Sequence, residues 1–189
     1  MLTDKELQNW CVRNKKSKKT IKVIANVRSS PPARRVESNF HNVCGRFPSK
    51  KMGHTIQFES RTLELAFIYM CEYDPNVLEF WDQPPRYSSF YTYKDRKRGV
   101  HCTSDFFLIL RDRAGWVECK TEQRLENLAE KPTRVYYKDE DGLWHYQPGE
   151  NYARQFDLFF EVRSSAQIDP TLIRNMHFLE DYFDEKDES

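Results

Sequence analysis

The chain has 189 residues, of which 39% are hydrophobic and 14% aromatic, and its formal net charge is +1. This length and apolar content suffice for one well-buried domain and exclude a wholly disordered chain. The longest apolar run, over residues 65–71, is far shorter than the roughly 20 residues that a bilayer span requires. The five cysteines are scattered and form no CxxC pair, which is typical of a reducing compartment, so we expect a cytoplasmic protein with no membrane partner.

Charge is distributed unevenly along the chain. Residues 13–51 carry twelve Lys or Arg against one acid, Glu37, whereas residues 180–189 carry six acids and one Lys. A cationic first quarter is the surface expected for a polyanionic ligand. We therefore expect three parts: an N-terminal helix and basic arm over 1–55, a folded core over 56–183, and an acidic tail over 184–189.

Local patterns predict the first elements in chain order. Thr3 and Glu6 make a capping box for a short helix over 3–13, whose apolar stripe is Leu7, Trp10 and Cys11. Residues 14–22 have the composition of a basic linker, and weak alternation predicts a strand over 21–27. Residues 29–52 show no regular period, and an irregular basic segment of that length is usually functional or mobile.

The strongest helical pattern covers residues 58–73 and is ended by Asp74-Pro75. One face of that helix is predicted to carry Leu63, Ala66, Phe67 and Met70. Beyond it, strands are predicted over 77–81, 86–93, 105–110, 116–120 and 158–162, and a hairpin over 135–147. Helices are predicted over 122–131 and 152–155, and a last helix begins at Asp169. The apolar face of that last helix is predicted to carry Leu172, Ile173, Met176, Leu179 and Phe183. This mixture predicts an α/β fold with a mixed sheet flanked by helices.

Residues 105–120 contain an apolar strand, a turn over 111–115 and a returning strand. If the turn centres near Asp112-Arg113, Asp105 lies opposite Lys120. Because side chains alternate between the faces of a sheet, Asp105, Glu118 and Lys120 then project from one face. Two carboxylates and a lysine would be gathered at one end of the strand pair.

Two neighbouring carboxylates repel each other, and their burial is costly unless a cation compensates. A hard divalent ion such as Mg²⁺, with Mn²⁺ as a substitute, suits such oxygen ligands and keeps room for water and phosphate oxygens. The ion can polarise a phosphodiester and activate water, while Lys120 orients that water or steadies the developing charge. The alternative is a cross-strand ion pair between Asp105 and Lys120 beside a surface Glu118, and the hairpin alone leaves both open.

Glu64 lies within the apolar stretch of the strong helix, so it is either near the surface at the helix start or directed to a metal ion. A helix Glu, then a strand Asp, then a strand Glu-x-Lys is the chain order of PD-(D/E)XK nucleases. With this quartet in place, the segments FESRTLELAFIYMCEYDPNVLEFWDQP, HCTSDFFLIL and WVECK resemble the catalytic domain of TnsA, the endonuclease subunit of heteromeric bacterial transposases. The resemblance extends over about residues 28–183.

The resemblance implies a restriction-endonuclease-like fold and a Mg²⁺-dependent DNA endonuclease that hydrolyses the 5′ strands at transposon ends during cut-and-paste DNA transposition. It assigns the active site to Glu64, Asp105, Glu118 and Lys120, with the three acids as metal ligands and Gln83 as a neighbour. Ser104 stands where the family's motif has Pro, and the 135–147 hairpin resembles an insertion of open role.

The implied partners are double-stranded DNA at transposon ends, a DDE-type transposase subunit and an AAA+ transposition ATPase, in a bacterial cytoplasm. The chain ends near the expected end of the catalytic domain, which puts recruitment of the ATPase by the family's usual route in doubt. Phosphate contacts are expected from Arg28, Arg34, Arg35, Arg46, Lys50 and Lys51. The alternative for these cations, and for Lys15 to Lys19, is solvated surface.

Two other functions stay open at this point. The first keeps the nuclease fold as a stand-alone restriction or repair enzyme, which would cut DNA without a partner protein. The second is a non-catalytic DNA-binding scaffold of a transposition complex, against which the intact quartet argues.

Overall fold

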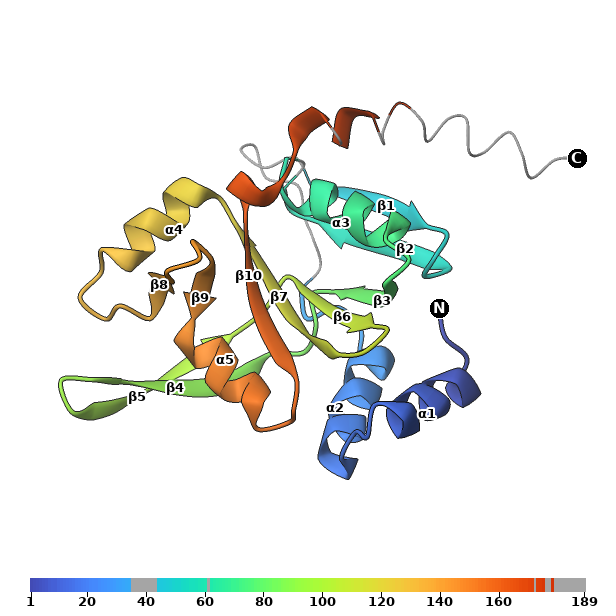
Figure 1. Cartoon of the computed structure of the whole chain (residues 1–189), viewed down its shortest axis with the longest axis horizontal. Coiled ribbons are helices and arrows are strands. Elements are labelled where there is room, and N and C mark those ends of the chain that lie inside the picture. The colour runs from blue at the N-terminus through green and yellow to red at the C-terminus, as the bar shows by residue number, and fades with distance from the viewer. Residues whose placement is uncertain (35–43, 61, 172, 176–177, 179–189) are drawn as a thin grey trace, which may run out of the picture.

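The computed structural model places the chain in a mixed α/β fold, and the structure describes residues 1–34, 44–60, 62–171, 173–175 and 178 (Figure 1). A four-stranded sheet lies at its centre. Its strands are β3 (Val77–Asp82), β6 (Phe106–Leu110), β7 (Ala114–Lys120) and β10 (Phe159–Ser164), in the order β10-β7-β6-β3. β6 pairs antiparallel with β3 and β7, and β10 pairs parallel with β7.

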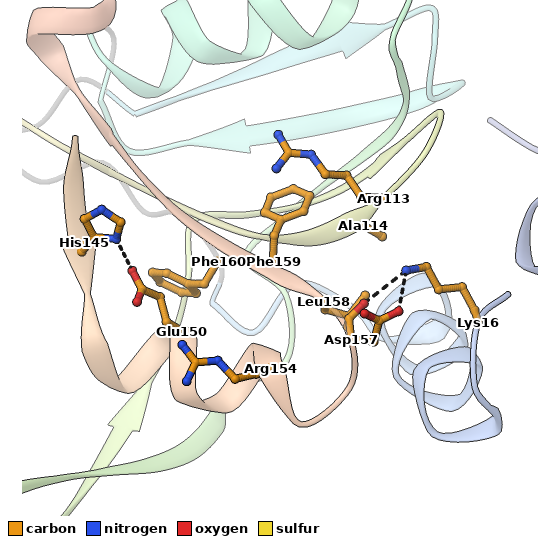
Figure 2. Close-up of a pocket in the computed structure, with 10 residues that line it drawn as sticks. All are labelled: Lys16, Arg113, Ala114, His145, Glu150, Arg154, Asp157, Leu158, Phe159 and Phe160. Carbon is orange, nitrogen blue, oxygen red and sulfur yellow. Dashed lines mark hydrogen bonds and ion pairs between the residues drawn. The ribbon is translucent and has the colours of Figure 1, made fainter. Parts of the chain in front are cut away.

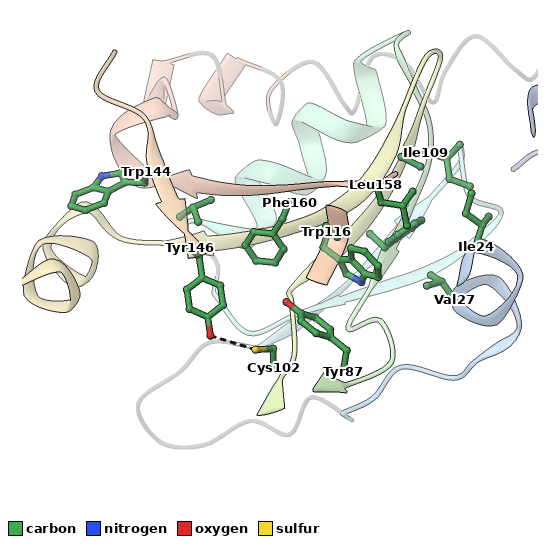
Figure 3. Packing of buried hydrophobic residues seen from close by; sticks show 14 of the residues in the cluster. Ile24, Val27, Tyr87, Cys102, Ile109, Trp116, Trp144, Tyr146, Leu158 and Phe160 are labelled. Atoms are coloured by element: carbon green, nitrogen blue, oxygen red, sulfur yellow. Dashed lines mark hydrogen bonds between the residues drawn. The ribbon is translucent and has the colours of Figure 1, made fainter. Parts of the chain in front are cut away.

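Both faces of the central sheet are buried, which explains why β6 is an unbroken apolar run. On one face, Phe107 and Trp116 pack in a cluster with Ile24 and Phe160, part of which is drawn in Figure 3. On the other face, Phe106 packs in a cluster with residues of α3 (Glu64–Tyr73) and of the hairpin formed by β1 (Gly45–Ser49) and β2 (His54–Phe58). The central sheet therefore lies between two hydrophobic clusters, one on each of its faces.

The first helix is confirmed. α1 (Asp4–Arg13) is capped by Thr3, whose side chain and that of Glu6 form both halves of the capping box. Trp10 and Cys11 of its apolar stripe are buried, and Trp10 Nε1 donates to the carbonyl oxygen of Leu110 at 2.7 Å. This bond ties the N-terminal helix to the end of β6.

The predicted linker over 14–22 and strand over 21–27 are wrong, because α2 (Lys18–Ser29) is a helix. Ser17 caps it by accepting from Thr20 N, and Thr20, Ile24 and Val27 are buried at helical spacing. Weak alternation over residues 21–27 suggested a strand, but the packing of Ile24 and Val27 in the core selects a helix. Residues 4–29 therefore belong to the folded body instead of a separate arm.

The segment 29–52 is more regular than predicted. β1 (Gly45–Ser49) and β2 (His54–Phe58) form an antiparallel hairpin, so the expected boundary between residues 55 and 56 falls inside a strand. Phe58 belongs to β2 and not to the predicted helix, because α3 begins only at Glu64. The helix ends at Tyr73, with Asp74 as its C-cap, as expected. Residues 35–43 lie outside the described part of the chain.

The connection from β3 to β6 contains a two-stranded ribbon. β4 (Tyr87–Tyr93) was predicted, whereas β5 (Arg96–Cys102) was missed. Between β7 and β10 lie α4 (Glu122–Ala129), the hairpin of β8 (Tyr136–Lys138) and β9 (Trp144–Tyr146), and α5 (Gln147–Arg154). The predicted helix over 122–131 and hairpin over 135–147 are confirmed, while α5 begins five residues earlier than expected.

A short 3-10 helix, η1 (Ser165–Gln167), follows β10. Residues 170, 171, 173–175 and 178 are helical, and Asp169 Oδ1 accepts from Thr171 N at 2.8 Å, as expected of the predicted N-cap. Ile173 packs against the cluster around α3. The other residues predicted for this helix's apolar face, Leu172, Met176, Leu179 and Phe183, and the acidic tail lie outside the described residues. Across the described ranges, no helix has both the length and the apolarity needed to cross a membrane.

Gly115 allows the close approach of β7 and β10. It pairs with Phe159, and a Cβ at this position would collide with the carbonyl oxygen of Phe159. Because the collision is with backbone, Gly115→Ala is expected to lower the free energy of unfolding by about 3 kcal/mol in urea denaturation. Gly99→Ala is the matched control, since nothing lies within 4 Å of the added methyl group. Equal stability of the two variants would contradict the tight β7–β10 pairing.

Candidate active site

Asp105 comes directly before β6, and three hydrogen bonds fix its position. Its N–H donates to the carbonyl oxygen of Val117 at 3.1 Å, and its own carbonyl oxygen accepts from Gln83 N at 2.8 Å. Its side-chain Oδ2 accepts from Cys119 N at 2.7 Å. The carboxylate is therefore held against β7 at the end of the sheet where Glu118 and Lys120 lie.

The predicted register of the β6–β7 hairpin was wrong by two residues. Phe107 pairs with Trp116 and Phe106 with Val117, so the continued ladder puts Asp105 opposite Glu118 instead of Lys120. The turn is tighter than expected, with Leu110 N donating to Arg113 O at 2.8 Å. Because a shift of two residues preserves the alternation of faces, Asp105, Glu118 and Lys120 still belong to one face.

Glu118 has a partner at each of its carboxylate oxygens. Lys120 Nζ lies 2.6 Å from Oε1, and the Tyr136 hydroxyl donates to Oε2 at 2.9 Å. The side chains of Glu118 and Lys120 are only 12% and 23% exposed. The ion pair of Lys120 is therefore with Glu118, and not the cross-strand pair with Asp105 that was the alternative interpretation of the sequence.

Glu64 is the first residue of α3 and is only 8% exposed. Its Oε2 accepts from Glu59 N at 2.8 Å, in the segment between β2 and the helix. A carboxylate at a helix N-terminus is favoured by the helix dipole. The fold therefore holds Glu64 inside the protein at the start of its helix.

The charges of these four residues act on one another. Burial, together with the neighbouring carboxylates Glu64 and Glu118, raises the pKa of Asp105 to about 7, against the lowering effects of the Cys119 N–H and Lys120. Burial also raises the pKa of Glu64, and among the charges near it Lys120 lowers that pKa. The structure thus brings the four predicted residues into one electrostatic cluster with more negative than positive charge.

The metal set predicted from Glu64, Asp105 and Glu118 is not assembled as a coordination shell. Within the part of the chain that the structure describes, no three His, Cys, Asp or Glu side chains converge closely enough to hold a metal ion. Each carboxylate instead accepts from a neighbouring donor, respectively Glu59 N, Cys119 N, and Lys120 with Tyr136. The donor chemistry still suits a hard divalent cation, since all three ligands are oxygens and the negative charge around Asp105 is not fully neutralised.

A cavity of about 220 Å³ opens beside Glu118. It is lined by polar and aromatic side chains, among them Tyr87, Ser104, Glu118, Tyr136 and Tyr146. Tyr136 and Tyr146 stack with their ring centroids 4.4 Å apart, which fixes the hydroxyl that Glu118 accepts from. The sequence interpretation missed both tyrosines, because it left the 135–147 hairpin without a role.

Gln83 is the predicted neighbour of the site, and its backbone contacts Asp105 directly. It is 1% exposed and has a positive φ of 44°, which is uncommon for a residue other than glycine. Among the described residues its Oε1 finds no hydrogen-bond partner. A buried amide oxygen without a hydrogen-bond donor is energetically costly, and so is a positive φ. Gln83 therefore combines two unfavourable features, which are typical of functional sites.

Two of the predicted DNA-binding cations, Arg28 and Lys51, have partners inside the protein. Arg28 Nε lies 3.1 Å from the fully buried carboxylate of Glu79, and its Nη2 donates to Leu2 O at 2.6 Å. Lys51 Nζ donates to the carbonyl oxygens of Cys71 and Asp74 at 2.6 and 2.7 Å, which caps the C-terminal end of α3.

The other predicted cations differ in position. Arg34 is exposed, and its Nη1 lies 3.9 Å from Oε1 of Glu59, the residue whose N–H donates to Glu64. Arg46 and Lys50 are exposed on the β1–β2 hairpin side. Arg35 lies outside the described residues. Only Arg34 is thus shown beside the site.

A second cavity, of about 490 Å³, lies at the other end of β7, where Ala114 lines it (Figure 2). Ion pairs already join several of its lining side chains, including Lys16 with Asp157 at 3.0 Å and His145 with Glu150 at 2.6 Å. None of the four predicted catalytic residues lines it. This cavity is therefore separate from the carboxylate cluster.

No protein-family model matches this chain, and a search of curated proteins finds no match either.

The hydroxyl of Tyr136 gives a direct test of how Glu118 is held. Tyr136→Phe removes the donor to Glu118 Oε2 and leaves the ring stack with Tyr146 in place. Because the hydrogen bond is to a charged group, we expect a loss of about 1 to 2 kcal/mol in the free energy of unfolding, measured in urea at pH 8. Tyr137→Phe is the control, since that exposed tyrosine stacks on His145 on the same hairpin. An equal effect of both substitutions would contradict the Tyr136–Glu118 bond.

Proposed function

We propose that this protein is a Mg²⁺-dependent DNA endonuclease with a restriction-endonuclease-like fold, acting as the TnsA-like subunit of a heteromeric transposase. In this proposal it hydrolyses the 5′ strands at transposon ends, in the bacterial cytoplasm, together with a DDE-type transposase and an AAA+ ATPase. The observation that carries the proposal is the cluster of three carboxylates and one lysine at the end of β6 and β7. Burial of Asp105 and the neighbouring carboxylates Glu64 and Glu118 raise the pKa of Asp105, and a bound cation would counteract this rise.

The order of elements supports the fold assignment. A helix that begins with Glu64 leads to β3, β6 and β7, then to α4 and the parallel strand β10. The chain order of a helix Glu, a strand Asp and a Glu-x-Lys strand supports the arrangement that the TnsA resemblance implies. We therefore include the restriction-endonuclease-like fold in the proposal.

The roles of the residues follow from their positions. Asp105 and Glu118 would hold the ion, and Glu64 would join them or act through a water. When bound, the ion supplies Lewis-acid polarisation of the scissile phosphate. Lys120, whose Nζ lies 2.6 Å from Glu118 Oε1, would donate to the attacking water or to the phosphate oxygens. Tyr136 holds Glu118 in place, and the Cys119 N–H holds Asp105.

The test is cleavage of DNA carrying the transposon ends, incubated with Mg²⁺ and the partner transposase. Wild type is expected to cut the 5′ strands, and Asp105→Ala is expected to leave them intact. Asp82→Asn is the control, because Asp82 is also buried but its carboxylate accepts from Gln57 N at 3.1 Å instead of from a partner of the quartet. Equal 5′ cleavage by wild type and Asp105→Ala would overturn the proposal. Cleavage by wild type without any partner would instead assign it to a stand-alone nuclease.

A second candidate function is a non-catalytic DNA-binding scaffold. One observation favours it, namely that both oxygens of Glu118 are already used by Lys120 and Tyr136. The scaffold predicts no binding of Mg²⁺ or Mn²⁺ and an unchanged affinity for DNA when Glu118 is replaced by Gln. Metal binding that is lost in Glu118→Gln would exclude it.

A further inference from the structure

The β4–β5 ribbon projects from the body of the protein (Figure 1). It forms a two-stranded sheet of its own, in which β4 and β5 pair only with each other among the described strands. Its base is fixed, because the ring of Tyr87 stacks on Tyr152 of α5 at 4.2 Å and Ser89 Oγ donates to Pro148 O at 2.7 Å. Its tip is a tight turn at Lys94 and Asp95, with φ values of 48° and 58°.

The tip of the ribbon is strongly cationic. Four basic side chains gather there, all exposed: Lys94, Arg96, Lys97 and Arg98. In the part of the chain that the structure describes, none of the four is ion-paired with a carboxylate. The only acid in the ribbon is Asp95 of the turn. A projecting surface with several uncompensated cations is suited to a polyanion.

Aromatic side chains accompany the cations on both faces of the ribbon. Lys97 Nζ lies 3.4 Å from the ring centroid of Phe90, which is 43% exposed. The residue opposite Phe90 is Gly99, which carries no side chain to cover the ring. On the other face, Arg98 pairs with Tyr91 and Arg96 with Tyr93. A ligand that surrounds the ribbon would thus meet cations and rings on both sides.

The base of the ribbon is joined to the candidate active site at both ends. β5 ends at Cys102, three residues before Asp105. β4 begins four residues after Gln83, whose N–H donates to the Asp105 carbonyl oxygen. Tyr87 and Cys102, which pair at the base, line the cavity beside Glu118. A ligand held along the ribbon is therefore held at a fixed position relative to the four charged residues of the site.

We propose that this ribbon enters a groove of double-stranded DNA and binds its phosphates through Arg96, Lys97 and Arg98, with Phe90 against the sugars or base edges. The inference rests on the proposed function for its choice of ligand, the duplex that the site would cut. A two-stranded ribbon fits the major groove of B-form DNA, about 12 Å wide. The major groove of A-form RNA is too narrow for it. The cations would position the duplex and contribute little sequence specificity.

The experiment measures the affinity of the full chain for a 30-base-pair DNA duplex by fluorescence anisotropy, in EDTA so that no cleavage occurs. The test variant is Arg96→Gln/Lys97→Gln/Arg98→Gln. The matched control removes the same charge from exposed positions of α1 and α2, with Lys5→Gln/Arg13→Gln/Lys22→Gln. We expect the ribbon variant to bind at least about 20-fold more weakly than the control. The slope of log affinity against log salt should fall by about 2 to 3, as expected for three lost phosphate contacts.

Binding of the ribbon variant equal to that of the control would overturn the inference, whether or not the protein cleaves DNA. A loss of affinity confined to an RNA duplex of the same length would overturn it too, by assigning the ribbon to RNA. A loss of DNA affinity in the ribbon variant supports the inference even if wild type never cuts DNA, and in that case only the proposed nuclease function fails. All substituted side chains are exposed, so a matching circular dichroism spectrum confirms that the variants fold.

Discussion

Asp105→Asn should stabilise the protein at pH 8 in EDTA and at the same time remove its response to Mg²⁺. In the folded state burial raises the pKa of Asp105 to about 7, above the ordinary value of 3.8. The folded protein therefore holds this proton more tightly than the unfolded chain does, and stability is lost as pH rises from about 4 through 7. Asparagine keeps the acceptor for Cys119 N and carries no charge.

The size of this gain follows from the two pKa values. A rise from 3.8 to about 7 corresponds to a gain on the order of 4 kcal/mol for the variant at pH 8, and to little at pH 4. Urea denaturation at both pH values measures it. Addition of 10 mM Mg²⁺ should stabilise wild type and leave Asp105→Asn unchanged. Asp82→Asn is the matched control, because burial also raises the pKa of Asp82, yet this variant should keep the response to Mg²⁺.

A gain at pH 8 that is the same at pH 4 would contradict the assigned charge of Asp105. An unchanged response of Asp105→Asn to Mg²⁺ would contradict its role as a ligand. These two outcomes concern different claims, so the electrostatic description of the cluster can stand even if the metal assignment fails.

Lys120→Met should reduce Mg²⁺-dependent 5′ cleavage by roughly 10³-fold, the loss typical of a group that stabilises transition-state charge. Methionine keeps the length of the side chain against the Tyr136 ring, which lies 6.0 Å from Lys120 Nζ, and removes only the cation. Single-turnover cleavage of DNA carrying the transposon ends, with the partner transposase present, is the measurement. DNA affinity in EDTA should stay within a few-fold of wild type.

The control for this prediction is Lys138→Met. Lys138 also forms an ion pair with a glutamate, with its Nζ 2.7 Å from Glu122, but it is more exposed and lies outside the quartet. This variant should cleave at the wild-type rate. Equal losses in the two lysine variants would show that Lys120 acts only as a structural ion-pair partner.

Local signals predicted the elements whose stability depends on nearby residues. The capping box at Thr3 and Glu6 predicted α1, and Asp74-Pro75 predicted the end of α3. α2 was missed because residues 21–27 alternate weakly, as in a strand, while the burial of Thr20, Ile24 and Val27 selects a helix. β5 was missed because Arg96, Lys97 and Arg98 carry no apolar alternation, and only pairing with β4 makes that segment a strand.

The sequence predicted which residues form the candidate site more accurately than it predicted how they are arranged. Alternation along β7 put Glu118 and Lys120 on one face, and this holds despite the two-residue error in register. The bond from Tyr136 to Glu118 joins residues 18 positions apart, on a hairpin whose packing no local pattern reveals. Arg28 and Lys51 illustrate the same limit, since their partners Glu79 and the carbonyl groups of α3 are distant in sequence. Contacts between residues that only tertiary packing brings together could not be predicted from the sequence.

The most direct test of the central claim is a calorimetric titration of the protein with Mn²⁺ in the presence of a DNA duplex. The claim is that Glu64, Asp105 and Glu118 bind one divalent ion beside Lys120. It predicts Mn²⁺ binding in wild type that is weakened at least about tenfold in each of Glu64→Gln, Asp105→Asn and Glu118→Gln, and unchanged in Asp82→Asn. Absence of binding in wild type, or binding that none of the three substitutions weakens, would contradict it.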